Sequence, residues 1–393
     1  MRTYQKTHSW INFKIDLQQA DYKLWLLLGE AAAKCEHVAG VLLQPKLALL
    51  LHTVFLTKGV YSTTTIEGNT LTEEEVKQRL EGKLKLPSSK EYLGLEIDNV
   101  LEAYNLIGQK TLEASEFELS VDEIKEYNRL VLQNLPLEED VIPGEIRQHN
   151  VTVARYLGAP PEDLSYLLEE TCKFLNDFTG ITKPAVLGIL KAIIAHLHIA
   201  WIHPFADGNG RTARLVEFQI LLSAGIPTTS AHLLSNHYNE TRSEYYRYLA
   251  LSSKDEQGIL AFIQYALQGF VDNLDMQIKL IEAQQRIVSW RDYIFETFRM
   301  ETKGSLVDNR RRKLILDLSD KFFSEGMQGV HIPEIRYISP RIAEAYADKT
   351  DKTVQNDISK LEKLGLVVKT IDGIQPNIGI MLAFLPQKRI NQS

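Results

Sequence analysis

Residues 203–214 read HPFADGNGRTAR, and this stretch decides how the chain around it is expected to fold. Apolar, helix-like runs precede it at 185–202 and follow it at 215–224. Its Asp-Gly and Asn-Gly pairs, residues 207–210, indicate a tight turn in which glycine permits positive φ. We therefore predict two helices joined by a turn, with unpaired amide N–H groups pointing outwards where the second helix begins.

This turn has the composition of an anion-binding site. Amide N–H groups at a helix N-terminus, with the helix dipole behind them, bind phosphate. Arg211 opens the second helix, and Arg214 lies three residues further along, on a neighbouring part of the same face. Two guanidinium groups suit a ligand with two or three phosphates. We predict that Gly208, Asn209 and Gly210 line this site together with the two arginines.

The same stretch holds a carboxylate and an imidazole. Asp207 is a candidate Mg²⁺ ligand, since Mg²⁺ usually takes one or two protein carboxylates and completes its shell with water and phosphate oxygens. His203 is a candidate general base, because the unperturbed pKa of histidine lies near neutrality. Taken singly, His-Pro would mark only a helix boundary and Asn-Gly only a turn, and Phe205 is predicted to lie in the core. The functional interpretation therefore rests on the whole stretch.

The composition is that of a soluble globular protein. A length of 393 residues predicts two or three domains. The hydrophobic fraction of 44% and the charged fraction of 24% are ordinary for this class. A net charge of −7 gives no overall attraction to nucleic acid or to anionic membranes. Cys35 and Cys172 are too few for a disulfide framework, so we expect a reducing compartment.

The sequence contains no stretch typical of a signal peptide or a membrane span. The N-terminus is polar, and the apolar residues 24–28 lie too far into the chain and follow Asp16 and Asp21. Residues 41–56 are apolar, but they are interrupted by Pro45 and by polar residues and are too few to cross a bilayer. We expect a cytoplasmic protein without a membrane partner.

Nearly the whole chain has the pattern of helices, and strands are indicated mainly in the last quarter. Apolar residues at helical spacing between Asp275 and Phe298 predict a long connecting helix. We predict a mainly α protein in four parts: an N-terminal helical region at 1–117, a helical core around the motif at 118–285, a connecting helix and linker at 286–304, and a final domain at 305–393.

The final domain has the predicted element order of a winged helix-turn-helix. It carries 14 Lys/Arg against 11 Asp/Glu, so its charge of +3 contrasts with the acidic remainder of the chain. Gly365 is a typical residue after a helix C-terminus, and Asp372-Gly373 indicates a hairpin turn. The predicted elements are, in order, helices at 340–348 and from Thr353 to just before Gly365, followed by strands at 366–370 and 378–384.

The stretch 203–214 resembles the signature of the Fic family, HPFx(D/E)GNGRxxR, and it matches every specified position. Two further segments are similar to this family. PGEIR at 143–147 and VTV at 151–153 resemble its flap, a small β-hairpin that positions the target segment. The pair Tyr245-Tyr246 resembles the tyrosines of its adenine pocket. The resemblance covers about 118–285.

This resemblance implies a Fic-type helical bundle with a β-hairpin flap. It also implies that Val153 and Ala154 of the flap, with Tyr245 and Tyr246, contribute to nucleotide binding. The chain departs from the pattern at Ser253, where many relatives have an asparagine that contacts the adenine or ribose.

The implied reaction is adenylylation (AMPylation) of a protein hydroxyl, with ATP as substrate and Mg²⁺ as cofactor. His203 would take the proton from a Ser, Thr or Tyr of a target protein or of the chain itself, and the oxygen would attack the α-phosphorus of ATP. Positioning and charge neutralisation supply most of the catalysis in such transfers. The kinase-like branch of the family, resembling the Doc toxin, carries Ala and Lys here, whereas Gly208 and Gly210 favour nucleotidyl transfer.

An upstream segment, TTTIEGN at 63–69, matches the family's inhibitory motif, (S/T)xxxE(G/N). The match implies an inhibitory helix at about 60–68 that contributes Thr63 and Glu67. Glu67 would pair with Arg214 and withhold this arginine from the γ-phosphate, so that ATP binds in an unproductive pose.

Other interpretations of Glu67 stay open. In the plainest of them, Glu67 is a solvated charge before a turn. Thr72 and Glu75 form a capping-box pattern for the next helix, so a loop at this place needs no inhibitory role. Some relatives use the equivalent glutamate to remove AMP, so a de-AMPylase is a further alternative.

Three histidines invite a metal-site interpretation. His196 and His203 share one helical face, but His198 does not, and neither CxxC nor HExxH accompanies them. We interpret His196 as a buried, hydrogen-bonded residue that supports the active-site helix.

The final domain also leaves alternatives open. Its second helix could enter a DNA major groove, with Arg310–Lys313 touching phosphate. Otherwise the domain packs on the core or forms a homodimer, and the basic run is a solvated face. The rival function is a DNA-binding regulator whose core only senses nucleotide. The residues expected to face outwards are Thr353, Gln355, Asn356, Ser359 and Lys360.

Overall fold

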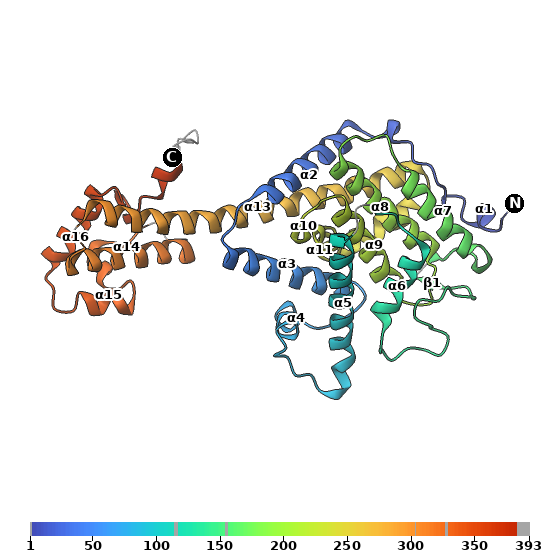
Figure 1. The fold of residues 1–393 in the computed structure, drawn as a ribbon, viewed down its shortest axis with the longest axis horizontal. Helices are drawn as coiled ribbons and strands as arrows, with labels where there is room; N and C mark the ends of the chain where they lie inside the picture. The colour runs from blue at the N-terminus through green and yellow to red at the C-terminus, as the bar shows by residue number, and fades with distance from the viewer. Residues whose placement is uncertain (1, 114–116, 154–155, 303, 327–328, 383–393) are drawn as a thin grey trace. The chain divides into compact units, whose positions relative to one another are not determined.

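Helices dominate the protein, which confirms the prediction of a mainly α fold (Figure 1). The chain divides into two compact units, residues 1–279 (unit 1) and 280–393 (unit 2). The described residues include one two-stranded antiparallel sheet in each unit. This computed structural model describes residues 2–113, 117–153, 156–302, 304–326 and 329–382.

The two helices on either side of the predicted turn form the centre of unit 1. They are α8, Pro184–Ile202, and α9, Asn209–Ser223. Their close approach needs Gly188, because a Cβ atom there would lie 2.1 Å from the Cβ of Ala224. The other helices of unit 1 are α1 Tyr4–Thr7, α2 Tyr22–Gly40, α3 Pro45–Thr65, α4 Glu73–Leu80, α5 Glu91–Glu113, α6 Val121–Leu132, α7 Leu164–Asp177, α10 Thr228–Ala231, α11 Leu233–Glu240, α12 Arg242–Ser252 and the first part of α13, Glu256–Glu301.

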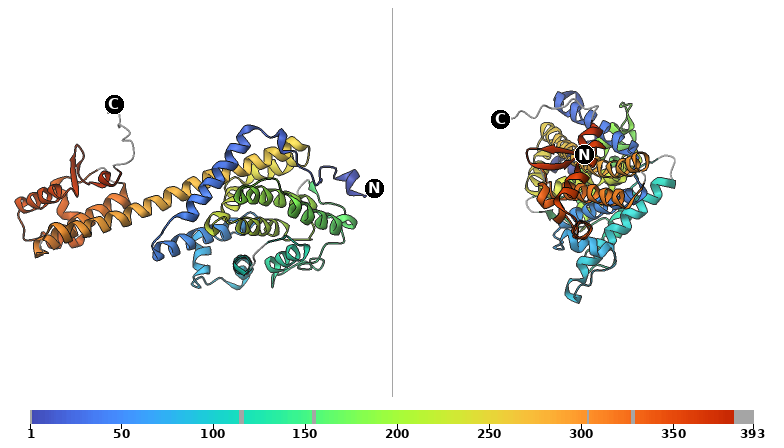
Figure 2. Two further views of the ribbon diagram at one scale, coloured as in Figure 1. Left: turned by 45° about the horizontal axis from the view of Figure 1, so that its top comes forward. Right: turned by 90° about the vertical axis from the view of Figure 1, so that its left-hand side faces the viewer.

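Helix α8 is apolar on all sides because the bundle surrounds it. By length and composition it could cross a membrane, but 83% of its most apolar window is buried inside unit 1. Helices α2, α7 and α9 pack against it, and Figure 2 shows α8 among them in a second view. Its composition is therefore that of a core helix.

Helix α3 brings the N-terminal region to the core. It packs against α5, α9 and α11, and its last turn approaches α9. The predicted inhibitory helix at about 60–68 is part of this longer helix, which begins at Pro45 and ends at Thr65. Glu67 lies in the turn that follows, and Gly68 has a φ of 103°. The helix ends earlier than predicted because the amide N–H groups of residues 67 and 68 bond to carbonyls three residues back.

A short hairpin forms the predicted flap. Strand β1, Thr152–Val153, pairs with β2, Tyr156–Leu157, in antiparallel register. The N-terminal segment supports it, since the His8 imidazole bonds to the Leu157 carbonyl at 2.8 Å. The predicted nucleotide residue Ala154 lies outside the described residues, as does the side chain of Val153.

Unit 2 has the predicted element order of helix, helix and hairpin. Strands β3 and β4 pair across a turn in which Gly373 has a φ of 120°. Val330 forms an isolated bridge to Ile374 of the hairpin. The core is apolar and includes Trp290, Ile315 and Leu361. In chain order the elements are α14 Leu306–Glu325, α15 Pro340–Ala345, α16 Asp351–Lys363, β3 Val367–Thr370 and β4 Gly373–Pro376.

Two element predictions in unit 2 need correction. The returning strand predicted at 378–384 is wrong: β4 occupies 373–376, and Ile378–Leu382 is a 3₁₀ helix. The strand comes earlier because the tight turn pairs Thr370 directly with Gly373. Helix α15 ends at Ala345, before the predicted end at 348.

Helix α13 belongs to both units. The predicted connecting helix, 275–298, is the second part of this helix, and the boundary between the units falls inside it at residues 279 and 280. Beyond that boundary, Trp290, Ile294 and Phe298 lie in the core of unit 2.

Candidate functional site

His203 is the residue that ends α8. Its backbone is left-handed, with φ 50° and ψ 61°, which is uncommon for a residue with a side chain. Its ring is partly buried, and this burial lowers the pKa of His203 to about 4, with the positive charge of Arg147 acting in the same direction. The imidazole is therefore neutral at neutral pH and able to accept a proton.

Arg147, from the predicted flap segment, fixes the backbone around His203. Its Nε donates to the His203 carbonyl at 2.8 Å and its Nη2 to the Ala159 carbonyl at 2.6 Å, while its amide donates to Pro204. The residue is 3% exposed. Burial lowers the pKa of Arg147 to about 10, which leaves the guanidinium charged at neutral pH. The predicted flap segment and the loop that follows α8 are thus joined through one buried cation.

Asparagine side chains hold the loop between α8 and α9 in shape by hydrogen bonding to its backbone amides and carbonyls. Asn209 accepts from the Phe205 amide at 2.9 Å and donates to the Phe205 carbonyl at 2.8 Å. Asn128 of α6 donates to the Asp207 carbonyl at 2.8 Å and accepts from the Gly144 amide. Asn209 was predicted to bind nucleotide, but its side chain is occupied in shaping the loop. Asn128 was missed, because a lone asparagine within a helix has no distinctive sequence pattern.

Arg214 and Glu67 meet as predicted. The Arg214 Nη2 lies 2.6 Å from Glu67 Oε1, and Arg214 also donates to the hydroxyl and the carbonyl of Thr63. The arginine side chain is fully buried, whereas that of Glu67 is 32% exposed. Burial alone would raise the pKa of Glu67, but the charge of Arg214 and its hydrogen bond outweigh this and lower the pKa.

Glycine is needed at two positions in this loop for different reasons. Gly208 caps α9 with a φ of 77°, a conformation that favours glycine. Gly210 makes room for the Glu67 carboxylate, because a Cβ atom there would lie 2.1 Å from Glu67 Oε1. The Glu67 carboxylate therefore rests directly on the first turn of α9.

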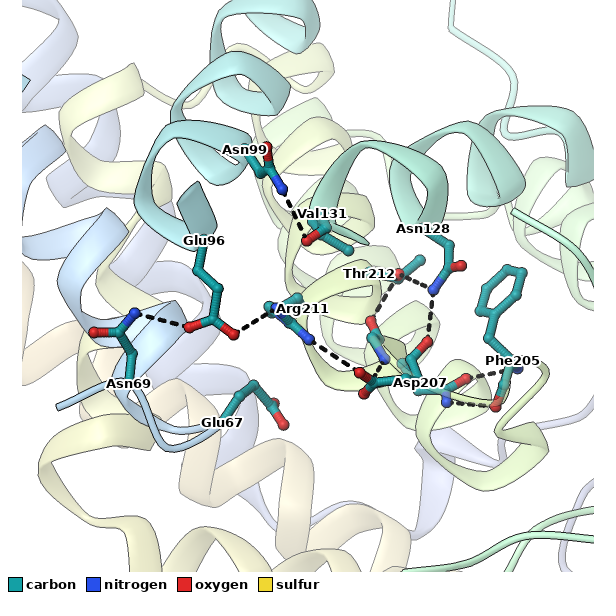
Figure 3. Close-up of polar contacts among 12 residues, drawn as sticks. Glu67, Asn69, Glu96, Asn99, Asn128, Val131, Phe205, Asp207, Arg211 and Thr212 are labelled. Carbon is teal, nitrogen blue, oxygen red and sulfur yellow. Dashed lines mark hydrogen bonds and ion pairs between the residues drawn. The ribbon is translucent and has the colours of Figure 1, made fainter. Parts of the chain in front are cut away.

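Asp207 and Arg211 lie beside that turn (Figure 3). The Asp207 side chain is 54% exposed and is 3.6 Å from Arg211 Nη2. Arg211 is 5% exposed and its Nη1 lies 3.2 Å from Glu96 Oε1. Glu96, on α5, was not predicted, since the sequence gives no sign that α5 comes close to α9.

The predicted tyrosine pair divides into a buried and an exposed member. Tyr245 is 3% exposed, and its hydroxyl lies 2.9 Å from Nε2 of His196. This confirms that His196 is buried and hydrogen-bonded. Tyr246 is 44% exposed and its ring packs on that of Tyr245. Ser253, where the chain departs from the family pattern, follows α12 and donates to the Ala250 carbonyl.

The site retains hydrogen-bond donors without partners. Arg211 Nε and Arg214 Nη1 are buried and unpaired within the described residues. Such groups are costly to leave unpaired, and they are adjacent to the N-terminus of α9. A polyphosphate would supply acceptors to both arginines, and the exposed Asp207 carboxylate has the chemistry of a Mg²⁺ ligand. The residues present therefore fit a nucleotide with its metal.

Comparison with known proteins agrees with this geometry. Residues 118–221 match the model of the Fic/DOC family. Protein adenylyltransferase fic-1 from Caenorhabditis elegans is 32% identical over 206 residues, which are 52% of this chain and 38% of that protein. Protein adenylyltransferase Fic from Nematostella vectensis is 32% identical over 192 residues, 48% of this chain and 42% of that protein. The chain spans about two fifths of the length of these curated relatives.

Solved structures are similar in fold. Fic-1 from C. elegans is 27% identical with a TM-score of 0.53, covering 66% of this chain and 72% of that one. A Fic family protein from Desulfovibrio desulfuricans G20 has a TM-score of 0.54, covering 88% of this chain and 91% of that one. Its 18% identity means that it supports the fold alone.

Proposed function

We propose that this chain, which carries a Fic/DOC family domain at residues 118–221, is a protein adenylyltransferase restrained by its own Glu67. The observation that carries the proposal is the meeting of His203, Arg211 and Arg214 around the first turn of α9, with Glu67 bonded to Arg214. The relatives named protein adenylyltransferase support the reaction class.

The neutral imidazole of His203 is the general base. It takes the proton from a Ser, Thr or Tyr hydroxyl of the target, and that oxygen forms a bond to the α-phosphorus of ATP while the bond to pyrophosphate breaks. The left-handed backbone at 203 and the bonds from Arg147 hold the ring at the end of α8. A correctly placed base contributes about 10²–10⁴-fold to such a transfer.

Charge neutralisation comes from the first turn of α9. Arg211 and Arg214 would bind the phosphates together with the amide group of Gly210, whereas the Gly208 amide donates to Asp207 Oδ1 at 2.6 Å. Mg²⁺ would be held by Asp207 and would neutralise charge on the phosphates. Exposed Tyr246, packed on buried Tyr245, offers an aromatic face for the adenine.

Glu67 restrains this machinery by competing for Arg214. The γ-phosphate of ATP would need the same guanidinium group, and the carboxylate already occupies it at 2.6 Å. Thr63 adds two acceptors to the same arginine. ATP bound beside an occupied Arg214 would lack one phosphate contact and would lie in an unproductive pose.

The test is transfer of label from α-labelled ATP to protein in three versions of the chain. Glu67→Gly is expected to raise self-modification and target modification by about 10- to 100-fold, because a hydrogen bond to a charged group is worth about 1.5–3 kcal/mol. His203→Asn in the Glu67→Gly background removes the base, and asparagine tolerates the left-handed backbone that this position requires.

Two outcomes would overturn the proposal: no AMP transfer by the Glu67→Gly variant, or undiminished transfer after His203→Asn. A modified substrate that loses AMP only in the presence of Glu67 would instead support the de-AMPylase. Mass spectrometry of lysate treated with the Glu67→Gly variant would identify the modified hydroxyl.

The partners follow from the same site. We propose that the target adds a strand to the flap hairpin, where backbone hydrogen bonds give affinity with little side-chain selectivity. The chain itself is a second substrate in this proposal. A cytoplasmic location and a homodimer remain predictions from the sequence.

DNA binding by unit 2 is the second candidate function, and one observation favours it. Gln355, Asn356 and Ser359 are exposed on α16, the second helix of the helix-turn-helix order. The basic run offers less support than the sequence indicated, because Arg310 and Arg311 are both bonded to buried Asp357. Salt-dependent gel shifts with the full chain test this candidate; a DNA-binding regulator that only senses nucleotide would bind an operator and transfer no AMP.

A further inference from the structure

Both arginines of the motif are held by carboxylates from outside the matched domain. Glu67 follows α3 and holds Arg214, whereas Glu96 lies on α5 and holds Arg211. Each carboxylate belongs to the N-terminal region, before residue 118. We propose that Glu96 is a second restraining residue, which withholds Arg211 and anchors the turn that carries Glu67. This inference rests on the proposed function.

Glu96 uses its two oxygens for two different partners. Oε1 accepts from Arg211 Nη1 at 3.2 Å, and Oε2 accepts from Asn69 Nδ2 at 2.8 Å, as Figure 3 shows. Its side chain is 18% exposed, so both contacts lie largely out of water. Contacts of this kind are charge-assisted and stronger than neutral ones.

The contact with Arg211 interferes with phosphate binding. Arginine recognises phosphate best through two parallel N–H groups. Glu96 takes Nη1, and Asp207 lies 3.6 Å from Nη2, so that carboxylates face both terminal nitrogens. A Mg²⁺ ion on Asp207 would relieve one of these contacts, and Glu96 would remain as the group that holds Arg211 away from the phosphates.

The contact with Asn69 fixes the inhibitory turn. Asn69 is 5% exposed and lies two residues after Glu67. Its Nδ2 also donates to the Leu93 carbonyl at 2.9 Å, and its Oδ1 accepts from the Leu71 amide at 3.0 Å. The turn is thus attached to α5 at Asn69 and to α9 through Glu67. Movement of Arg211 towards a phosphate would take one partner from Glu96 and weaken this attachment.

The experiment compares Glu96→Gln with a matched control on the same helix. Both partners of Glu96 are donors, and an amide offers only one oxygen, so Gln cannot satisfy both. The control is Asp98→Asn, which removes one of the two ion pairs between α5 and Arg79 of α4 and leaves the pair of Arg79 with Glu91. Each variant is measured in the wild-type and Glu67→Gly backgrounds, for AMP transfer and for the Kd of MgATP and of adenosine.

We expect Glu96→Gln to raise AMP transfer about three- to tenfold in the wild-type background, which corresponds to about 1 kcal/mol. The rise should be smaller with Glu67→Gly, where the turn no longer matters and only Arg211 is freed. MgATP should bind more tightly by a similar factor. Adenosine, which has no phosphate for Arg211, should bind unchanged, and Asp98→Asn should behave as the wild type.

A lower transfer rate of Glu96→Gln in the Glu67→Gly background would mean that Glu96 assists Arg211, and it would overturn the inference. An equal effect of Asp98→Asn would overturn it too, because general loosening of α5 would then be the cause. Should Glu67→Gly itself transfer no AMP, the proposed function fails, and the difference between MgATP and adenosine binding still decides the role of Glu96.

Discussion

Each of the two units pairs arginine with a carboxylate, and the two arrangements differ in which partner is buried. In unit 2, Asp357 is 1% exposed and accepts from Arg310 and Arg311 at 2.7 Å each and from the Tyr346 hydroxyl at 2.9 Å. In unit 1, the side chain of Glu67 is one-third exposed, and its carboxylate shares Arg214 with Thr63.

The comparison shows what separates a structural ion pair from a releasable one. The carboxylate in unit 2 is enclosed, and its donors come from helices that form one core. The carboxylate in unit 1 follows the last turn of a helix, and Arg214 Nη1 remains without a partner among the described residues. An arginine with a spare donor beside an exposed partner is ready to accept a ligand; an arginine in a closed cluster is not.

The largest effect is expected when the cluster around Asp357 in unit 2 is broken. Asp357→Ala leaves the buried Tyr346 hydroxyl and two partly buried arginines without their shared acceptor, and this should destabilise unit 2 by about 3–5 kcal/mol. Hydrogen exchange of α14 and α16 amides measures the loss. Asp320→Asn is the control, since Asp320 pairs with Arg291 at the surface and should change stability by about 0–1 kcal/mol. Equal effects of the two substitutions would contradict the distinction.

A smaller effect is expected at the releasable pair. Glu67→Gln should lower the free energy of unfolding of unit 1 by about 1–2 kcal/mol, because an amide of the same size keeps at most a hydrogen bond to Arg214 and loses the charge of the ion pair. MgATP should then stabilise this variant more than MgADP does, since the γ-phosphate can engage Arg214. Thermal unfolding with each nucleotide measures the difference. If MgATP stabilised the wild-type chain over MgADP by the same amount, Glu67 would not occupy the contact that the γ-phosphate uses.

The smallest effect concerns pH. The folded pKa of Glu67 is lowered, so its stabilising contribution is complete above the unfolded value of about 4.3 and is lost only as pH falls below that. The ratio of Glu67→Gly to wild-type AMP transfer should therefore be constant from pH 8 to about pH 5.5. His203, with its pKa lowered to about 4, stays neutral over the same window. A ratio that collapses towards one at pH 6 would contradict the assignment of the pair.

The sequence predicted which residues lie close together around the first turn of α9 better than it predicted the contacts among them. The whole string 203–214 fixed the α8–turn–α9 arrangement, because glycine positions, helix patterns and charged residues agreed. The pairing of Glu67 with Arg214 was predicted from the upstream motif and is present. Glu96, Asn128 and the bonds of Arg147 needed the structure, since each depends on which helices meet in space.

In unit 2, the sequence pattern misjudged the surroundings of the residues that it singled out. Arg310 and Arg311 look like a solvated or phosphate-binding run in sequence, and the structure attaches both to Asp357, 46 or 47 residues further along the chain. A charge pattern reports residue type alone, whereas burial and partners are set by the tertiary fold. The misplaced strand at 378–384 has a related cause, because an apolar run of this length suits a strand and a 3₁₀ segment equally.

In the proposed function, the contact between Glu67 and Gly210 limits the substitutions that could remove the restraint on AMP transfer. Any side chain at position 210 would displace the Glu67 carboxylate, yet it would also fill the space that the proposal gives to the nucleotide phosphates. A selection for hyperactive alleles should therefore recover changes in Glu67, Thr63 and their neighbours, and should never recover changes at 210. The restraining carboxylate and the proposed phosphate site share the first turn of α9. Natural variation can therefore weaken the proposed restraint only through residues of the N-terminal region.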